Sequence, residues 1–305
     1  MIWPTRWSAL ALFLLLAPTI PGVANRTKAI LTGRRGAPVW QLYADLWKLV
    51  RRGVVYSTTT TDVFRVAPVA ILAATIVAAV LLPLDGQTSI LHFSGDAVAF
   101  ASLLALGRFA LVLAALDTGS SFEGMGASRE VAFASLVEPG LFVSLAALGV
   151  VAHDFSLSTM LGENDARAAT AAVMPSLVMV AISLFALTLA ECSRVPVDDP
   201  ATHLELTMVH EVIVLDHSGP DLAAILYASA LKLGLFAVII LNVLIPGGGP
   251  RGVAGLALLP GSFLVLGLAI GIVESVTARL RMSKVPLYIT GSSALALFGL
   301  ILVLR

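Results

Sequence analysis

The feature that most constrains this chain is a series of eight long apolar runs separated by polar connections. A helix needs roughly 20 apolar residues to cross a bilayer, and its backbone groups must bond internally because lipid offers them no partner. The runs cover about 4–23, 64–84, 97–116, 132–152, 168–189, 221–245, 252–274 and 287–304. They predict an all-α, polytopic transmembrane helix bundle of about eight helices. We expect one transmembrane domain over residues 1–305, with an acidic loop at 190–220 inside it.

The positive charges divide unevenly between the two alternating sets of loops. One set holds twelve: Arg26, Lys28, Arg34, Arg35, Lys48, Arg51, Arg52, Arg129, Arg194, Arg279, Arg281 and Lys284. The other set, which includes both termini, holds four: Arg6, Arg167, Arg251 and Arg305. Lys and Arg accumulate in cytoplasmic loops. We therefore expect the odd-numbered loops in the cytoplasm, both termini outside, and the chain in the inner (plasma) membrane. The first run also fits a signal peptide, but the spans that follow favour a retained helix.

Composition excludes several classes of function. Lys plus Arg (19) balances Asp plus Glu (19), so overall charge gives no support for a nucleic-acid partner. A single cysteine, Cys192, provides neither a disulfide nor the thiolates of an iron–sulfur cluster or structural zinc site. No serine or cysteine nucleophile triad is evident, and no catalytic residue is assigned. Any redox centre must therefore belong to a partner subunit.

A short amphipathic helix is predicted after the first span. Between Pro38 and Arg52, the apolar residues Trp40, Tyr43, Trp47 and Val50 recur at spacings of three and four, with Gln41, Asp45, Lys48 and Arg52 elsewhere around the helix. Such a helix lies along the membrane interface. The pattern fits a membrane-surface anchor and a docking ledge for a partner equally well.

The connection between the fifth and sixth spans is rich in acids. Seven of the 19 acids lie there, interleaved with apolar residues: Glu191, Asp198, Asp199, Glu205, Glu211, Asp216 and Asp221. Carboxylates clustered away from water load and release protons near neutral pH, and His203, His210 and His217 titrate close to that range. We expect a proton relay. A solvated charge run and a metal site remain alternatives, although no His-Glu-x-x-His pair occurs.

Ionisable residues also fall within or near the apolar runs, namely Arg108, Glu130, Glu138, Lys232 and Glu274. Charges at membrane depth usually face the bundle interior or a hydrated path, although those near span ends can reach the interface instead. Spacings of seven and eight would place Glu123, Glu130 and Glu138 on similar sides of one helix. Pro139 removes a backbone donor beside Glu138 and can open the helix there. The plainer alternative is a helix kink with a solvated glutamate.

Short motifs follow one another along the chain in a fixed order: Gly33-Arg34-Arg35-Gly36, Gln41 to Leu49, Ser128-Arg129-Glu130, Glu138-Pro139, Glu191 to Pro200, Leu204 to Glu211, Ser218 to Asp221, Glu274, Ala278 to Arg281, and Pro286. This ordered series resembles subunit 1 of respiratory complex I (NADH dehydrogenase subunit 1), and more closely its counterpart in formate hydrogenlyase and membrane-bound hydrogenases. The resemblance runs nearly the full length. Two departures from complex I favour the hydrogenase branch: the Ser-Arg-Glu pattern, and Ala201 and His203 where complex I has more glutamate.

The resemblance implies a subunit that joins a peripheral electron-transfer arm to antiporter-like membrane subunits and couples redox chemistry to proton or Na⁺ translocation. It implies hydrogenase-like large and small subunits and an iron–sulfur subunit as partners, which carry the Fe–S clusters and, in the hydrogenase case, a NiFe centre. The relay and coupling residues would be Glu130, Glu138, Glu191, Arg194, Asp198, Asp199, Glu205, His210, Glu211 and Lys232. The partner interface would comprise Arg34, Arg35, Gln41, Asp45, Lys48, Arg279 and Arg281.

Two other functions fit the sequence. The chain could form part of a quinone-reducing pocket beneath the redox arm. It could also be an independent secondary transporter, although no internal repeat of the kind expected for one is evident.

Overall fold

The computed structural model describes residues 3–161, 173–198, 208–245 and 254–305, and these residues form helices and connections without strands. The α-helices are α1 (Trp3–Leu16), α2 (Thr19–Leu31), α3 (Gln41–Val50), α4 (Asp62–Val80), α5 (Asp96–Asp117), α6 (Ser121–Ala152), α7 (Leu157–Leu161), α8 (Met174–Glu191), α9 (His210–Ile213), α10 (Gly219–Leu244), α11 (Leu258–Val276) and α12 (Val285–Leu304). Two 3₁₀ turns, η1 (Gly255–Ala257) and η2 (Met282–Lys284), precede α11 and α12.

Seven of these helices, extended in two cases by a 3₁₀ turn, are long and apolar enough to cross a membrane, and the pair α1 and α2 raises the number to eight if it forms one bent span. The predicted all-α transmembrane bundle is therefore confirmed. The first span differs in detail from the expected 4–23, because α1 ends at Leu16 and α2 leaves at an angle of 44°. Pro18 lies at the break, where a proline cannot supply the helical N–H.

The α6 helix begins earlier than the apolar run at 132–152 indicated. It starts at Ser121, so Glu123, Glu130 and Glu138 share one continuous helix as the spacing suggested. Pro139 lies inside it, and its missing N–H leaves the carbonyl of Ser135 without the usual helical donor. This places a polar backbone group beside Glu138.

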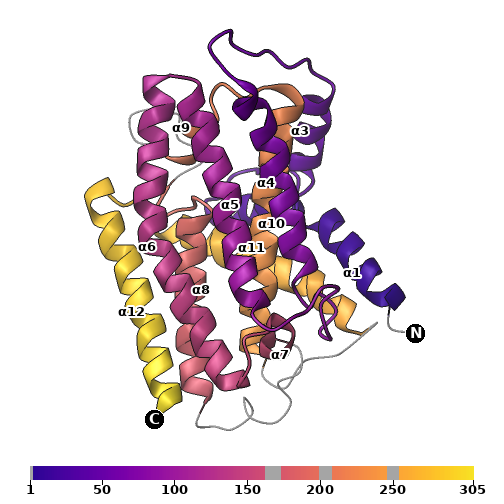
Figure 1. The fold of residues 1–305 in the computed structure, drawn as a ribbon, viewed down its shortest axis with the longest axis vertical. Coiled ribbons are helices and arrows are strands. Elements are labelled where there is room, and N and C mark those ends of the chain that lie inside the picture. The colour runs from indigo at the N-terminus through magenta and orange to yellow at the C-terminus, as the bar shows by residue number, and fades with distance from the viewer. Residues whose placement is uncertain (1–2, 162–172, 199–207, 246–253) are drawn as a thin grey trace.

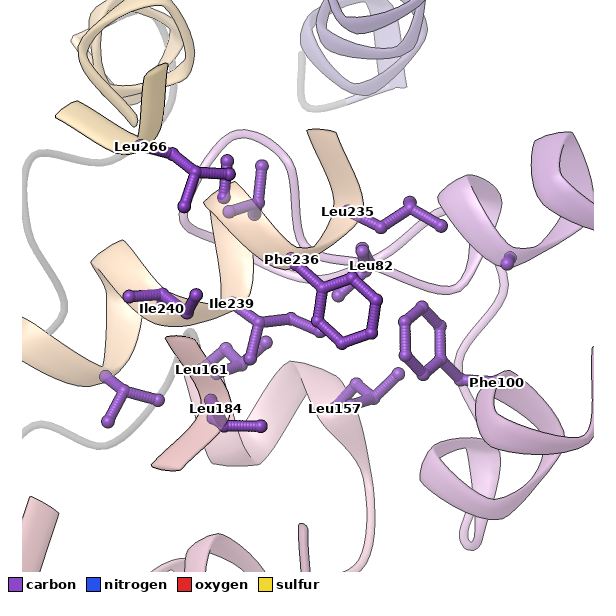
Figure 2. Close-up of a cluster of buried hydrophobic side chains, with 14 of the residues drawn as sticks. Leu82, Phe100, Leu157, Leu161, Leu184, Leu235, Phe236, Ile239, Ile240 and Leu266 are labelled. Atoms are coloured by element: carbon purple, nitrogen blue, oxygen red, sulfur yellow. The ribbon is translucent and has the colours of Figure 1, made fainter. Parts of the chain in front are cut away.

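Helices such as α4, α5, α6 and α12 run roughly along the long axis, whereas α11 and α1 lie obliquely to it. The α12 helix is along one edge and α1 at the opposite edge (Figure 1). The α12 helix packs on α6 and α8, α11 crosses α2, and α4 packs on α5 and α10. The core is centred on α10, where Phe236 faces Phe100 of α5 with Leu82 and Leu157 beside them (Figure 2). Large apolar side chains such as Phe109 and Phe298 are 59% exposed, as expected where lipid is the solvent.

The amphipathic helix predicted after the first span is present as α3, and its place along the membrane interface remains a prediction. None of its residues is buried, and the flanking Trp40 is 68% exposed. Within it, Gln41 donates to Asp45 (Nε2 to Oδ1, 3.0 Å), and Tyr43 donates to the carbonyl of Leu15 in α1. The α3 helix packs on α10 and α2 and is hydrogen-bonded to α1 through Tyr43. Trp47 within it and Trp40 just before it remain exposed.

Candidate functional site

The centre of the candidate site is Arg108, whose side chain is only 7% exposed. Its guanidinium reaches three glutamates on two other helices. Nη1 donates to Glu138 Oε1 at 2.5 Å, Nη2 donates to Glu191, and Nε lies 3.5 Å from Glu130 Oε1. Arg108 belongs to α5, Glu130 and Glu138 belong to α6, and Glu191 is the last residue of α8. The guanidinium fork suits this role because it presents several donors in fixed directions.

Lys232 of α10 is the second cation of the cluster. Its Nζ lies 2.7 Å from Glu191 Oε1 and donates to the carbonyl oxygen of Glu191 at 2.9 Å. Glu191 is the last residue of α8, so its carbonyl has no intrahelical donor and is available to the lysine. One ammonium thus satisfies both the side chain and the helix end of Glu191, joining α8 to α10.

The two α6 glutamates differ in exposure for a geometric reason. The side chain of Glu130 is 13% exposed and that of Glu138 is 40% exposed. Because each helical residue turns by about 100°, eight residues rotate the side chain by about 80°. Glu138 therefore points toward the edge of the bundle while remaining bonded to Arg108, and Glu130 points inward.

A cavity of about 50 Å³ adjoins this cluster. Its polar lining is Arg108, Glu130, Glu191, Cys192, His210 and Lys232, with Thr75 and Ser229, and its apolar wall comes from α4, α5 and α10. A cavity of that volume has room for a few water molecules, and its polar lining offers them hydrogen-bond partners. Water there would connect the carboxylates to the His210 imidazole.

His210 brings the acidic connection to this cavity. Burial lowers the pKa of its imidazole to about 4, assisted by the positive charges of Lys232 and Arg194 and opposed by Asp198. Its Nε2 is buried without a hydrogen-bond partner in the described part of the chain. The ring is therefore neutral at physiological pH. Burial likewise raises the pKa of the adjacent Cys192 thiol to about 12, so this cysteine remains protonated and is a poor metal ligand.

Asp198 holds the start of α9. Its Oδ2 accepts from the backbone N–H groups of Val209 (3.0 Å) and His210 (3.3 Å), and its Oδ1 lies 2.9 Å from Arg279 Nη2. The carboxylate is only 4% exposed. Asp198 therefore fixes His210 at the cavity, while Arg279, predicted at the partner interface, forms an internal ion pair.

A second buried pairing lies around Glu274 of α11, whose side chain is 1% exposed. Arg194 approaches its Oε1 at 3.6 Å and Lys28 of α2 approaches its Oε2 at 3.7 Å. Arg194 thus contacts a different glutamate from those of the Arg108 cluster. Glu274 was expected from the sequence to be a charge at membrane depth, but no feature of the sequence indicated Lys28 as its partner.

The remaining predicted residues are distributed as follows. Glu211 is half-buried beside His210, whereas Asp199 and Glu205 lie outside the described residues. Arg34, Arg35, Lys48 and Arg281 are exposed, and Gln41 and Asp45 are half-buried on α3. Arg108 was recognised in the sequence as an intramembrane charge but was not assigned to the relay, although it organises the site. Within the described ranges, no group of three or more His, Cys, Asp or Glu side chains is placed to hold a metal ion.

Comparison with known proteins places this chain in a family. Residues 6–304 match the family described as NADH dehydrogenase. Hydrogenase-4 component C of Escherichia coli (strain K12) is 32% identical over 237 residues, which cover 78% of this chain and 73% of that protein. Formate hydrogenlyase subunit 4 of the same organism is 30% identical over 284 residues, 91% of each chain.

The fold is shared with a solved structure. A chain of the membrane-bound sulfane sulfur reductase, described as an archaeal respiratory membrane complex, superposes with a TM-score of 0.82 over 99% of both chains. At 19% identity, that likeness concerns the fold alone. The family match spans every residue of the Arg108 cluster. The chain thus belongs to the NADH dehydrogenase family, among its members similar to subunit 1 of complex I.

Proposed function

We propose that this chain anchors a peripheral redox module at the membrane and couples electron transfer in that module to the movement of protons or Na⁺. The proposal is supported by the family and by the hydrogenase and formate hydrogenlyase relatives. It is also supported by the single cysteine, because iron–sulfur clusters need several thiolates and must then reside in partner subunits.

The observation that carries the proposal is the charge balance of the Arg108 cluster. Three carboxylates, Glu130, Glu138 and Glu191, face two cations, Arg108 and Lys232, so the fully ionised cluster has a net charge of −1. A net charge away from bulk water is unfavourable. One proton, or one Na⁺ in the adjoining cavity, neutralises it. The cluster is therefore built to take up and release a single positive charge.

Coupling requires that the charge on this cluster respond to the redox module. His210 faces the cavity from the acidic connection, and Asp198 and Arg279 fix its backbone. We infer that a partner contacting this connection moves His210 relative to Glu191 and Lys232, which changes how readily the cluster holds a proton. Glu211, Asp199 and Glu205 would lead protons from the water-facing end, and Arg194 would tune that entrance.

We further propose the arrangement of partners. The exposed cations Arg34, Arg35, Lys48 and Arg281, with Gln41, Asp45 and Arg279 nearby in the sequence, form the surface for hydrogenase-like large and small subunits and an iron–sulfur subunit. Antiporter-like membrane subunits lie alongside in the inner membrane. The α12 helix suits such a contact, because only 22% of the apolar stretch by which it would cross the membrane is buried within this chain.

Replacement of Glu138 or Glu205 by Gln tests the relay. Each variant of the assembled complex is prepared in sealed membrane vesicles, where redox turnover with a low-potential dye and ion uptake are measured together. We expect turnover to continue while ion uptake per turnover falls, because an amide cannot carry the proton. Asp62→Asn is the control, since this carboxylate on α4 is 89% exposed. Unchanged uptake in both glutamate variants would refute the relay.

A further inference from the structure

Glu123 is a buried carboxylate that the Arg108 cluster does not use. It lies in the first turn of α6 and is 0% exposed. It precedes Glu130 by seven residues, which places the two on nearly the same side of the helix and about 10 Å apart along its axis. Glu123 therefore extends the α6 glutamates toward the end of the bundle where α9 lies (Figure 1).

The two oxygens of Glu123 have different surroundings. Oε1 accepts a hydrogen bond from the backbone N–H of Asp216 at 3.0 Å. Oε2 is buried and has no hydrogen-bond partner among the residues that the structure describes. The Thr118 hydroxyl lies close enough to this carboxylate to donate a hydrogen bond to it, and it also lies 2.8 Å from the carbonyl oxygen of Ala115, to which it donates in this arrangement. One oxygen is thus positioned by the chain and the other is available to carry a proton.

The charge near Glu123 has the wrong sign to stabilise an anion. The charged side chain that lies near enough to interact with it electrostatically is Asp216, an exposed acid whose negative charge repels an ionised Glu123. An ionised carboxylate buried beside a like charge and only partly hydrogen-bonded is unfavourable, and a proton on Oε2 removes that charge. Asp216 meanwhile links this buried position to water at the surface.

The packing around Glu123 ties it to the segment that carries His210. A Cβ on Gly126 would lie 3.2 Å from the backbone nitrogen of Ile213, so the two backbones are nearly in contact there. Arg129 donates from Nη1 to the carbonyl of Met208 at 3.0 Å. Residues 208–216 are therefore held on α6 from both ends, by Arg129 at the start and Glu123 at the finish.

His217 supplies a second, independent sign of an unused polar site at this position. It follows Asp216, is 3% exposed, and stacks on Phe64 with ring centroids 4.0 Å apart. Neither of its ring nitrogens has a hydrogen-bond partner in the described part of the chain. His217 is thus a second buried titratable side chain with unused polar atoms. It directly follows the residue that binds Glu123, although its own ring packs on α4.

We propose that Glu123 is a further protonatable group on the path to the Arg108 cluster, taking a proton from water beside Asp216 and holding it on Oε2 before it passes toward Glu130. This inference rests on the proposed coupling function. Only O–H bonds change: hydronium gives its proton to the carboxylate and leaves water, and on release a water molecule accepts that proton again.

Glu123→Gln tests this role in the assembled complex. The amide oxygen can still accept from the Asp216 N–H, so the fold is retained while the proton site is lost. We expect redox turnover to persist and ion uptake per turnover to fall by roughly half or more, as when a positioned proton carrier is removed. Glu123→Asp, which keeps a carboxyl group, should restore much of the uptake.

Infrared difference spectra give a second measurement that does not depend on pumping. The carbonyl stretch of a protonated, buried carboxyl should change during turnover in the wild-type complex, be absent in Glu123→Gln, and shift in frequency in Glu123→Asp. If Glu123→Gln does not assemble, the shift in Glu123→Asp decides the question. An identical carboxyl spectrum in the wild type and the variants would overturn the proposal.

The Glu138→Gln variant, measured in parallel, separates the two proposals. If Glu138→Gln lowers ion uptake per turnover and Glu123→Gln leaves it at the wild-type value, the role of Glu123 is wrong and the coupling function stands. If neither variant changes uptake, the coupling function itself fails.

Discussion

Arg108 combines three functions that are usually assigned to different residues. It joins α5 to α6 and α8, it neutralises part of a buried negative charge, and it sets how much charge remains for a mobile cation to balance. Because a guanidinium keeps its proton at every physiological pH, the titrating members of the cluster must be its carboxylates or Lys232. Arg108 thus keeps a constant positive charge, while the proton or cation bound to the rest of the cluster can come and go.

Replacing Arg108 by Met should destabilise the chain strongly. The change leaves Lys232 to balance three carboxylates, and removing one partner of a buried ion pair costs about 3–5 kcal/mol. Combining it with Glu130→Gln should recover part of the loss, because one buried charge disappears. Thermal unfolding of the detergent-purified subunit or complex measures both. Equal melting temperatures for Arg108→Met and the wild type would contradict the central role of this residue.

His210 gives a prediction for pH. Burial lowers its pKa from about 6.5 to about 4, so the unfolded chain binds a proton that the folded chain does not. Stability is therefore undiminished above pH 6.5 and falls as the pH drops toward 4, by about 2–3 kcal/mol from this group. In His210→Gln the melting temperature should decline less over that interval than in the wild type. His92→Gln, at an exposed histidine, should follow the wild type.

At the scale of elements, the interiors of the spans were predictable from the sequence and several of their ends were not. Apolar length alone located α4, α5, α10 and α12 to within a few residues. The bend at Pro18 was not predicted, because the apolar run continues across this residue. The apolar run alone did not predict the early start of α6 at Ser121, because its first turns carry Glu123, Arg129 and Glu130. Only the seven- and eight-residue spacing of the α6 glutamates indicated it.

The crossing of α2 and α11 gives a prediction about packing. A Cβ on Gly271 would lie 2.7 Å from the carbonyl oxygen of Ala24 and 2.6 Å from Thr27 Cβ, so the helices cannot accommodate it without moving apart. Gly271→Ala should cost about 1–3 kcal/mol and loosen the nearby Lys28–Glu274 pair. Gly261→Ala on the same helix is the control, since no atom of the described residues outside its own helical turns lies within 4 Å of a Cβ placed there. It should be neutral or slightly stabilising. Similar melting temperatures for the two variants would contradict the close crossing.

At the scale of the whole molecule, the sequence identified most of the site residues but not how they pair. Arg108, Glu138, Glu191 and Lys232 come from four helices, and helical spacing relates residues only within one helix. The resemblance therefore grouped Arg194 with the relay carboxylates, whereas in the structure its ion pair is with Glu274, outside the Arg108 cluster. The resemblance supplied the list of residues, and only the packed bundle defines which charges meet.

The orientation of the molecule in the membrane yields the last prediction. The α9 segment and the C-terminus lie at opposite ends of the bundle (Figure 1). If the charge bias of the loops sets the topology, the basic loops face the cytoplasm and Arg305 faces outside. Single cysteines at Arg35, Arg281 and Arg305 can report this with a membrane-impermeant maleimide. The background should be low, because the only native thiol, Cys192, has a pKa raised to about 12 and remains protonated.

In intact cells we expect labelling of Arg305→Cys alone, and in inverted vesicles labelling of Arg35→Cys and Arg281→Cys alone. The physical reason is the cost of carrying twelve cations of the basic loops across the bilayer, against four on the other side. Each variant is also labelled after detergent is added, which controls for burial of the introduced thiol. The opposite pattern would place the acidic connection and His210 outside the cell, where no cytoplasmic redox module could reach them, and the coupling proposal would then fail together with the topology.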